Sequence, residues 1–450
     1  MIDRTLTGIA RLALRGFFRD LEVVGREQVP EDRPLLLVAN HFNALLDAVL
    51  VMHALGRLPR FVAKAALWRP AWARPFLWLA GMVPVTRPQD GGDTGGNHSA
   101  FLSCHEQLAR GGAVALFPEG GLSRAPRLRK LRTGAARIAL GARVAGARGL
   151  TIVPVGLFYE DKVALRSRAL VRIGVPIDLD VELARFGLDD ATEDDVEVVQ
   201  RLTAEIERRL GDAAPMYEHE HEAAVFGTAA EVALRDPDRL PPRPVPLVSR
   251  EELAGRLVRA PRPERERVHD ALARYQLGLS LTGLRDAYLV AEYRVRRLAA
   301  LFLSAAATLL LVAPFALVGA VVNVLPYWGV HWAGRLVRDP ALAASARLLA
   351  GVALFPTAWV LAAWLAPWDS WPARIGIVAA SPVLGLVAVR ALEQAVAVRR
   401  TWRGWITLVE RRGDRARLRA DRGRLVDLVE RTARVEDRPG RDEVPAHGPR

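Results

Sequence analysis

The stretch Leu35-Leu-Leu-Val-Ala-Asn-His-Phe-Asn-Ala-Leu-Leu-Asp47 joins a strand pattern to polar residues at its end. The continuously apolar run Leu35–Ala39 is typical of a strand that is covered on both faces. Asn40 and His41 follow directly, at the carboxyl edge of the predicted sheet, where open α/β sheets bind ligands. Asp47 comes six residues after His41, and a carboxylate that holds a histidine makes it a competent general base. The stretch therefore predicts a catalytic pair, although a structural loop would give the same pattern.

Short apolar runs alternate with helical patterns on both sides of this stretch. Connections of about 20–30 residues with helical patterns predict βαβ units and a largely parallel sheet. Residues 21–211 are therefore expected to form an α/β domain with helices surrounding the sheet. The expected strands are Leu35–Ala39, Phe61–Ala65, Met82–Thr86, Ala113–Phe117, Thr151–Phe158 and Leu170–Ile173.

Three further motifs lie at or next to expected strands. Phe117-Pro118-Glu119-Gly120 places a carboxylate beside a glycine, where it can hold a polyol hydroxyl, orient a cation or belong to a solvated turn. Arg87 follows Met82–Thr86, and an arginine there suits bidentate phosphate binding or is a surface charge. Ile152-Val153-Pro154-Val155 is apolar and fits a structural strand.

Together, in their order and spacing, the four motifs resemble the glycerolipid acyltransferase family, whose bacterial type is 1-acylglycerol-3-phosphate acyltransferase. The similarity covers about residues 15–180. It implies that His41 and Asp47 are the catalytic pair. It also implies acyl transfer from acyl-CoA or acyl-carrier protein to a hydroxyl of a glycerol-phosphate-type acceptor, a reaction that needs neither a metal nor a cofactor. Lysophosphatidate is the favoured acceptor, by family prevalence. The substrate-binding residues expected on this basis are Arg87, Glu119, Gly120, Asn40, Lys64 and Arg124.

The spacing of the expected catalytic pair departs from the commonest family pattern. Five residues separate His41 from Asp47, whereas four is the commonest number in the family. Relatives with additional C-terminal membrane segments share the longer form, and a helix start could absorb the extra residue. The hydrogen bond between His41 and Asp47 is therefore the feature that a structure has to test.

Long uncharged runs in the C-terminal half predict helices embedded in a membrane. Leu298–Gly334, Leu348–Trp368 and Ile375–Val389 contain no Asp, Glu, Lys or Arg, and a helix needs about 20 apolar residues to span the hydrocarbon core. Residues 298–391 are therefore expected to be membrane-embedded. The last two runs form a two-span hairpin, and the first folds back at Pro314 or lies partly in the interface. Tryptophans near the ends of the runs resemble an interfacial belt: Trp328, Trp332, Trp364, Trp368 and Trp371.

The arginines that flank these runs predict an orientation. Arginines cluster at both ends of the first run and after the last, whereas the turn Asp369–Pro372 carries no positive charge. Because basic flanks stay in the cytoplasm, we expect an integral protein of the cell membrane with its acyltransferase domain on the cytoplasmic face. A chain that ends near Arg235 is expected to lose membrane insertion and to keep activity, since no motif lies beyond Val155.

The remaining segments are assigned by composition. Residues 1–20 fit a basic amphipathic helix on the membrane surface, and equally a first helix that packs on its own domain. Residues 212–263 contain a proline-rich stretch and are expected to be a linker. Residues 264–297 fit a charged helical segment, and residues 392–450 fit a basic cytoplasmic tail.

Composition and motif content weigh against several other classes. The single cysteine, Cys104, excludes a disulfide scaffold and a multi-cysteine metal site. The net charge of +13, almost all from arginine, is accounted for by an anionic membrane, so no nucleic-acid partner is expected. Ser123 lies in a nucleophile-elbow pattern that lacks its last glycine, which disfavours a serine hydrolase. His219 and His221 could bind a metal but fit a solvated linker better. The alternative from a different class is a membrane-tethered lipid-binding or scaffold protein without catalysis; the sequence leaves the oligomeric state open.

Overall fold

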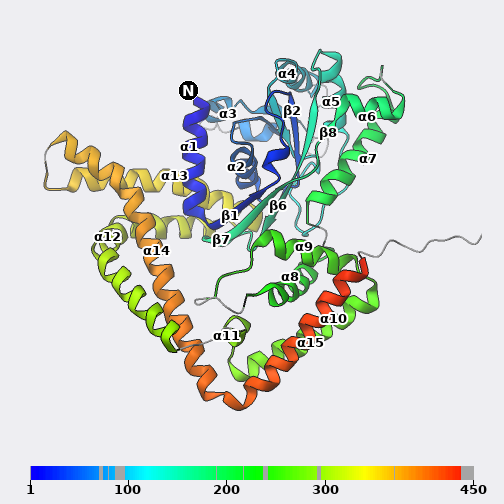
Figure 1. The fold of residues 1–450 in the computed structure, drawn as a ribbon. Helices are drawn as coiled ribbons and strands as arrows, with labels where there is room; N and C mark the ends of the chain where they lie inside the picture. The colour runs from blue at the N-terminus through cyan, green and yellow to red at the C-terminus, as the bar shows by residue number, and fades with distance from the viewer. Residues whose placement is uncertain are drawn as a thin grey trace, which may run out of the picture. The chain divides into compact units, whose positions relative to one another are not determined.

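The computed structural model describes residues 2–69, 74–79, 81–86, 97–188, 190–215, 217–236, 242–290, 295–368 and 370–436 (Figure 1). It divides into two compact units. The first unit comprises Met1–Met216 and Gly319–Leu386, and the second comprises Tyr217–Val318 and Val387–Arg450. The first unit holds all the strands of the described residues, and the second is helical.

An eight-stranded sheet in the order β1-β7-β6-β2-β5-β3-β4, with β8 paired to β6, forms the centre of the first unit. β2 is parallel to β5 and β6, β3 is parallel to β4 and β5, and β1 is parallel to β7, whereas β6 runs antiparallel to β7 and β8. The predicted α/β domain with a largely parallel sheet is confirmed. The strands are β1 (Phe18–Val24), β2 (Leu35–Ala39), β3 (Arg60–Lys64), β4 (Val83–Val85), β5 (Ala113–Leu116), β6 (Thr151–Tyr159), β7 (Ser167–Ile173) and β8 (Ile177–Asp178).

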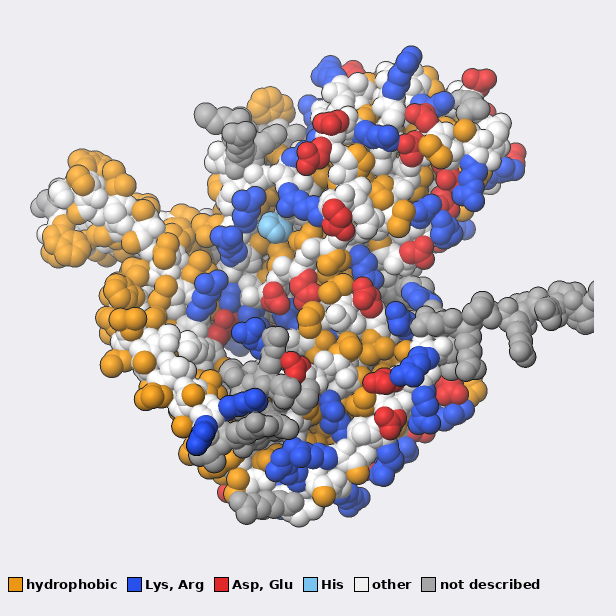
Figure 2. Space-filling view, viewed as in Figure 1, with side chains coloured by type: hydrophobic (Ala, Val, Ile, Leu, Met, Phe, Trp, Pro, Cys, Tyr) orange, Lys and Arg blue, Asp and Glu red, His pale blue; other side chains and the backbone are white. Residues whose placement is uncertain are grey.

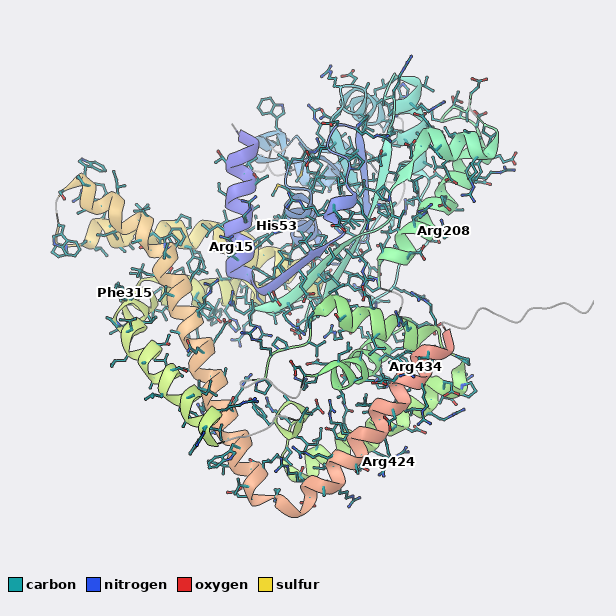
Figure 3. The ribbon with its side chains drawn as sticks, in the orientation of Figure 1. Arg15, His53, Arg208, Phe315, Arg424 and Arg434 are labelled. Carbon is teal, nitrogen blue, oxygen red and sulfur yellow. The ribbon has the colours of Figure 1, made fainter. Side chains whose placement is uncertain are left out.

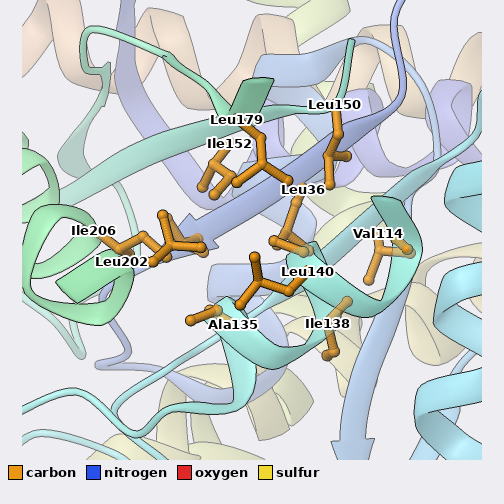
Figure 4. Packing of buried hydrophobic residues seen from close by; sticks show 14 of the residues in the cluster. Leu36, Val114, Ala135, Ile138, Leu140, Leu150, Ile152, Leu179, Leu202 and Ile206 are labelled. Atoms are coloured by element: carbon orange, nitrogen blue, oxygen red, sulfur yellow. The ribbon is translucent and has the colours of Figure 1, made fainter. Parts of the chain in front are cut away.

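Helices cover both faces of this sheet because successive strand side chains point to opposite sides. Leu36 of β2 packs with α4, α5, α6 and α7 in one buried cluster, part of which is drawn in Figure 4. Leu35 and Leu37 pack in a second cluster with α1 and α2. The helices named here, with the shorter ones of the same region, are α1 (Ile2–Phe17), η1 (Arg26–Gln28), α2 (Ala44–Leu55), η2 (Ala65–Trp68), α3 (Arg74–Leu79), α4 (Asn97–Ala109), α5 (Gly134–Val144), α6 (Leu179–Phe186) and α7 (Val196–Ala213).

Helix α1 packs on the domain and still presents apolar side chains to solvent. Leu14 is buried in the second cluster, whereas Ile9 and Leu12 are 49% and 42% exposed. Arg15 of α1 lies near His53 of α2 (Figure 3). Burial, and to a lesser degree nearby arginines including Arg15, lower the pKa of His53. One side of α1 therefore packs on its own domain, as one of the two alternatives predicted. The apolar residues on its other side are exposed, so they are free to contact a membrane surface.

Three helices of the described residues are long and apolar enough to cross a membrane: α12 (Val295–Leu336), α13 (Pro340–Leu365) and α14 (Trp371–Glu410). Hydrophobic side chains cover the α13–α14 hairpin (Figure 2), and Phe315 of α12 is 56% exposed (Figure 3). The alternative that the first run folds back at Pro314 is wrong, because α12 is continuous for 42 residues, about 63 Å at 1.5 Å per residue. Such a helix is about twice as long as the hydrocarbon core is thick.

Inside the hairpin region, a polar side chain joins the three apolar helices. Asn323 of α12 donates to the carbonyl oxygen of Ser381 in α14 over 3.3 Å, and it accepts from the Trp359 indole nitrogen in α13 over 2.8 Å. A Cβ atom on Gly319 would lie 2.0 Å from the Leu384 carbonyl oxygen. Glycine therefore permits the close approach of α12 and α14, as small residues do between membrane helices.

The second unit corrects two sequence predictions. Residues 212–263, expected to be a linker, contain α8 (Glu220–Leu234) and α9 (Leu247–Arg259). Residues 392–450, expected to be a tail, contain α15 (Arg412–Glu436). These helices bury apolar residues in one cluster with α10 (Arg262–Thr282) and α11 (Asp286–Val290). Among the described residues, Pro246 is the N-cap of α9, Pro261 is the N-cap of α10 and Pro263 lies in its first turn, so these prolines mark helix starts rather than an extended spacer.

Candidate active site

His41 and Asp47 form a hydrogen-bonded pair at the carboxyl end of β2. His41 lies in the loop after β2, and Asp47 lies in the first turn of α2, where its side chain is fully buried. The His41 Nδ1 atom is 2.8 Å from the Asp47 Oδ2 atom. The predicted contact therefore exists in spite of the five-residue spacing.

A strained residue accommodates the longer spacing. Ala44 begins α2 with φ +38°, in the left-handed region that costs a non-glycine residue free energy. The chain thereby turns sharply enough for the Asp47 carboxylate to reach back over its own helix start. Its Oδ2 atom accepts the backbone N–H groups of Phe42 and Asn43 over 2.6 and 2.7 Å. The extra residue is absorbed at the helix start.

All the hydrogen-bond partners found for the Asp47 carboxylate are donors or the His41 ring. The Tyr159 hydroxyl at the end of β6 donates to the Asp47 Oδ1 atom. Burial, followed by the charge of Asp47, raises the pKa of Tyr159 well above its ordinary value, so this hydroxyl keeps its proton. An ionised Asp47 suits these partners and makes His41 Nδ1 a donor, which leaves the Nε2 atom of a neutral His41 to accept a proton.

The Phe117-Pro118-Glu119-Gly120 motif directly follows the neighbouring strand β5 and contacts His41 through two of its side chains. The Phe117 ring stacks on the His41 ring, with centroids 3.9 Å apart and planes 10° from parallel. Glu119 is buried, and its carboxylate accepts the backbone N–H groups of His41 over 2.9 Å and Arg129 over 3.1 Å. Burial raises the pKa of Glu119, and these two hydrogen bonds oppose the rise. Glu119 thus anchors the backbone of His41, a contact the sequence motif did not reveal.

Gly120 brings the adjoining chain close to a basic side chain. It has φ +70°, and a Cβ atom at this position would lie 2.4 Å from the Arg132 Nε atom. Residues 124–132 form a stretch with several exposed basic side chains. These exposed residues are Arg124, Arg127, Arg129, Lys130 and Arg132.

The other expected substrate-binding residues have different outcomes. Asn40 is buried, and its amide donates to the Leu157 carbonyl oxygen and accepts the Leu157 N–H group. The buried amide thus ties the end of β2 to the backbone of β6, and its role in substrate binding stays a prediction. Lys64 is the half-buried last residue of β3, at the same sheet edge as His41, and Arg124 is exposed. Arg87 lies outside the described residues.

The serine of the alternative hydrolase pattern donates its hydroxyl to backbone carbonyl oxygens. The Ser123 hydroxyl lies 3.0 Å from the Ala125 carbonyl oxygen and 3.2 Å from that of Arg127. The Ser123 backbone N–H group donates to the His41 carbonyl oxygen over 2.7 Å. Among the described residues, no group of three or more His, Cys, Asp or Glu side chains could hold a metal ion.

Sequence comparison identifies the region that carries this site. The acyltransferase family model matches residues 20–157. A segment of 108 residues is 33% identical to glycerol-3-phosphate O-acyltransferase 2 of Saccharomyces cerevisiae and covers 24% of this chain and 14% of that protein. A segment of 158 residues is 28% identical to a chloroplastic 1-acyl-sn-glycerol-3-phosphate acyltransferase of Arabidopsis thaliana and covers 34% of this chain and 40% of that protein. The matches thus span less than half of these curated relatives.

A solved structure is also similar to part of the chain. It is the 1-acyl-sn-glycerophosphate acyltransferase of Thermotoga maritima, with 19% sequence identity and a TM-score of 0.33. The similarity covers 46% of this chain and 78% of that chain.

Proposed function

Since residues 20–157 match the acyltransferase family model and segments of the chain are similar to glycerol-3-phosphate and 1-acyl-sn-glycerol-3-phosphate acyltransferases, we propose that the protein transfers a fatty acyl group from an acyl thioester to a hydroxyl of a glycerol-phosphate-type acceptor in phospholipid biosynthesis. The observation that carries this proposal is the 2.8 Å contact between His41 and the fully buried Asp47 carboxylate. Lysophosphatidate is the acceptor we favour, and the donor is acyl-CoA or acyl-carrier protein.

In the proposed reaction, His41 acts as the general base. Its Nε2 atom takes the proton of the acceptor hydroxyl while the hydroxyl oxygen attacks the thioester carbonyl carbon. Asp47 stabilises the imidazolium that results, as the carboxylate of a catalytic triad does. The tetrahedral intermediate then expels the thiolate, which receives the proton from His41. The products are the ester and the free thiol, so the step needs neither an enzyme-bound acyl group nor an added reactant.

The proposed phosphate site is the exposed basic stretch 124–132 together with Arg87. Guanidinium groups bind phosphate through paired hydrogen bonds, and the stretch begins five residues after Glu119, which contacts the His41 backbone. A membrane-facing role of the same arginines fits equally well. Arg87→Lys tests phosphate binding by Arg87, because lysine keeps the charge and loses the planar fork. We expect the acceptor KM to rise more than the donor KM, and an equal rise in both would contradict phosphate recognition by Arg87.

We also propose that the domain lies on the cytoplasmic face of the cell membrane. Support comes from the three long apolar helices and from the arginines at their flanks. An active site at this surface could release its amphiphilic product directly into the leaflet.

The test of the proposed reaction is acyl transfer by the full-length protein in lipid vesicles. The acceptors are glycerol 3-phosphate, lysophosphatidate and other lysophospholipids, each with acyl-CoA and with acyl-carrier protein. His41→Ala should abolish transfer, whereas His98→Ala, on the exposed side of α4, should leave it unchanged. Absence of transfer to every acceptor by the folded wild type would refute the enzyme proposal and favour a lipid-binding or scaffold protein.

A further inference from the structure

A serine in the apolar helix α13 contacts the loop between His41 and Asp47. The Ser345 hydroxyl donates to the Asn43 carbonyl oxygen over 2.9 Å. The Ser345 hydroxyl oxygen accepts the backbone N–H groups of Leu45 over 3.1 Å and Leu46 over 3.4 Å. The Leu46 N–H group also donates to the Asn43 carbonyl oxygen, over 2.9 Å. These partners are about 300 residues away in the sequence, and Ser345 is only 6% exposed.

This hydroxyl bridges the two peptide groups on either side of Ala44. One is the peptide whose carbonyl belongs to Asn43, and the other is the peptide whose N–H group belongs to Leu45. Ala44 is the residue with φ +38° that absorbs the longer spacing. Because a residue in this region needs its surroundings to hold it there, Ser345 stabilises the turn.

Ser345 also takes the place of a capping side chain for α2. The first N–H groups of a helix have no partner within the helix and are usually satisfied by the side chain of the N-cap residue. The N-cap residue Asn43 gives no such hydrogen bond, and its side-chain amide donates to the Lys162 carbonyl oxygen instead. The acceptor for the Leu45 N–H group at the α2 start therefore comes from α13.

The surrounding contacts fix α13 at this position. Ala344 and Leu348 are buried in the same apolar cluster as Leu46 of α2. The Arg347 guanidinium donates to the Val163 carbonyl oxygen, in the loop that also accepts the Asn43 amide. The first turns of α13 are thus part of the packed core of the catalytic domain.

We propose that Ser345 is a positioning residue of the acyl-transfer reaction, through which α13 sets the geometry of the His41–Asp47 pair. Asp47 lies in the first turn of α2, directly after the two residues whose N–H groups Ser345 accepts. Loss of the hydroxyl frees this turn and moves the carboxylate relative to the His41 ring. The proposal rests on the proposed acyl-transfer function for its kinetic consequence, whereas the contact itself can be measured without turnover.

The test compares three variants of the full-length protein in lipid vesicles. Ser345→Ala removes the hydroxyl, and Ser345→Thr retains it. Thr357→Val is the matched control, because the Thr357 hydroxyl on the same helix bonds only to the Ala353 carbonyl oxygen of its own helix. We expect Ser345→Ala to lower kcat about tenfold, the effect of losing a helix cap, with little change in either KM. Thr357→Val should keep wild-type kcat, and Ser345→Thr should recover most of it.

Amide hydrogen exchange gives the second measurement. The Leu45 amide should exchange about tenfold faster in Ser345→Ala than in the wild type and should be unchanged in Thr357→Val. Equal kcat values in Ser345→Ala and Thr357→Val, or unchanged exchange at Leu45 in Ser345→Ala, would overturn the proposal. A wild type that transfers no acyl group would refute the proposed function, and the exchange comparison would still test whether Ser345 holds the turn.

Discussion

The substitution Asp47→Asn tests the proposed catalytic pair with little disturbance of its surroundings. The Oδ2 atom of Asp47 accepts two backbone N–H groups and contacts the His41 ring, and the Tyr159 hydroxyl donates to Oδ1. The side-chain amide of an asparagine at position 47 can be placed in two orientations. If its NH2 group took the Oδ2 position, it would face the backbone N–H groups of Phe42 and Asn43, which are also donors. The amide oxygen must therefore occupy the Oδ2 position and the NH2 group must face Tyr159, whose hydroxyl can rotate to accept.

The substitution is expected to cost free energy of unfolding as well as rate. Three hydrogen bonds change from charge-assisted to neutral, each losing about 1 kcal/mol, so the loss is about 3 kcal/mol before the benefit of removing a buried charge. The variant should therefore fold. Without the carboxylate charge the imidazolium is not stabilised, and kcat should fall by about 10²- to 10⁴-fold, the range of general-base catalysis.

The assay is steady-state acyl transfer in lipid vesicles, with thermal unfolding of the same samples to verify folding. Asp161→Asn is the matched control, because Asp161 also accepts two backbone N–H groups, those of Val163 and Ala164, over 2.8 and 2.9 Å, and does not contact His41. It should keep wild-type kcat. The double variant of His41→Ala and Asp47→Asn should be no slower than His41→Ala alone, since the two residues act as a unit. A folded Asp47→Asn protein with more than about a tenth of wild-type kcat would refute the assigned role.

Three other predictions follow from the structure. Gly120 and Gly111 have φ +70° and +77°, so Gly120→Ala and Gly111→Ala should each lower the free energy of unfolding by about 1–2 kcal/mol in denaturant. Only Gly120→Ala should also raise the acceptor KM, because its Cβ atom would displace Arg132. Burial lowers the pKa of His105 below 6.5, so as the pH falls this histidine binds a proton in the unfolded chain before it does so in the folded protein. The Tm of the wild type should therefore fall from pH 7 to pH 5, and the Tm of His105→Gln should fall less. An equal fall in both proteins would count against a role of His105 in this pH dependence. Asn323→Leu should lower stability in mixed micelles by about 1 kcal/mol, and an unchanged unfolding midpoint would show that its interhelical bonds contribute nothing.

The sequence predicted six of the strands to within a few residues, because each is a short apolar run followed by polar or turn residues. It missed the two-residue strand β8 and it missed β1, whose charged residues Arg19, Asp20 and Glu22 break the apolar pattern. β1 pairs only with β7 at the end of the sheet order, and an edge strand tolerates charges that a central strand excludes.

The structure also changes the expectation for a shortened chain. A chain that ends near Arg235 lacks α13, and with it Ser345 and the buried side chains of Ala344 and Leu348. We therefore expect it to lose activity as well as membrane insertion, contrary to the inference from motif positions alone. Motif positions could not reveal this dependence, because α13 contributes packing and a helix cap, and neither has a sequence motif.

Local patterns in the sequence determined the α/β domain, the sheet edge that carries His41 and Glu119, and the long apolar helices. Short apolar runs indicate buried strands, motifs at the ends of these runs indicate the sheet edge, and long uncharged runs indicate apolar helices. Only the tertiary structure decided that Asp47 reaches His41 across five residues, and that Tyr159 and Ser345 hold the two ends of this arrangement. These contacts join residues about 112 and 302 positions apart. They depend on the packing of whole strands and helices, which fixes a strained turn that no local propensity favours.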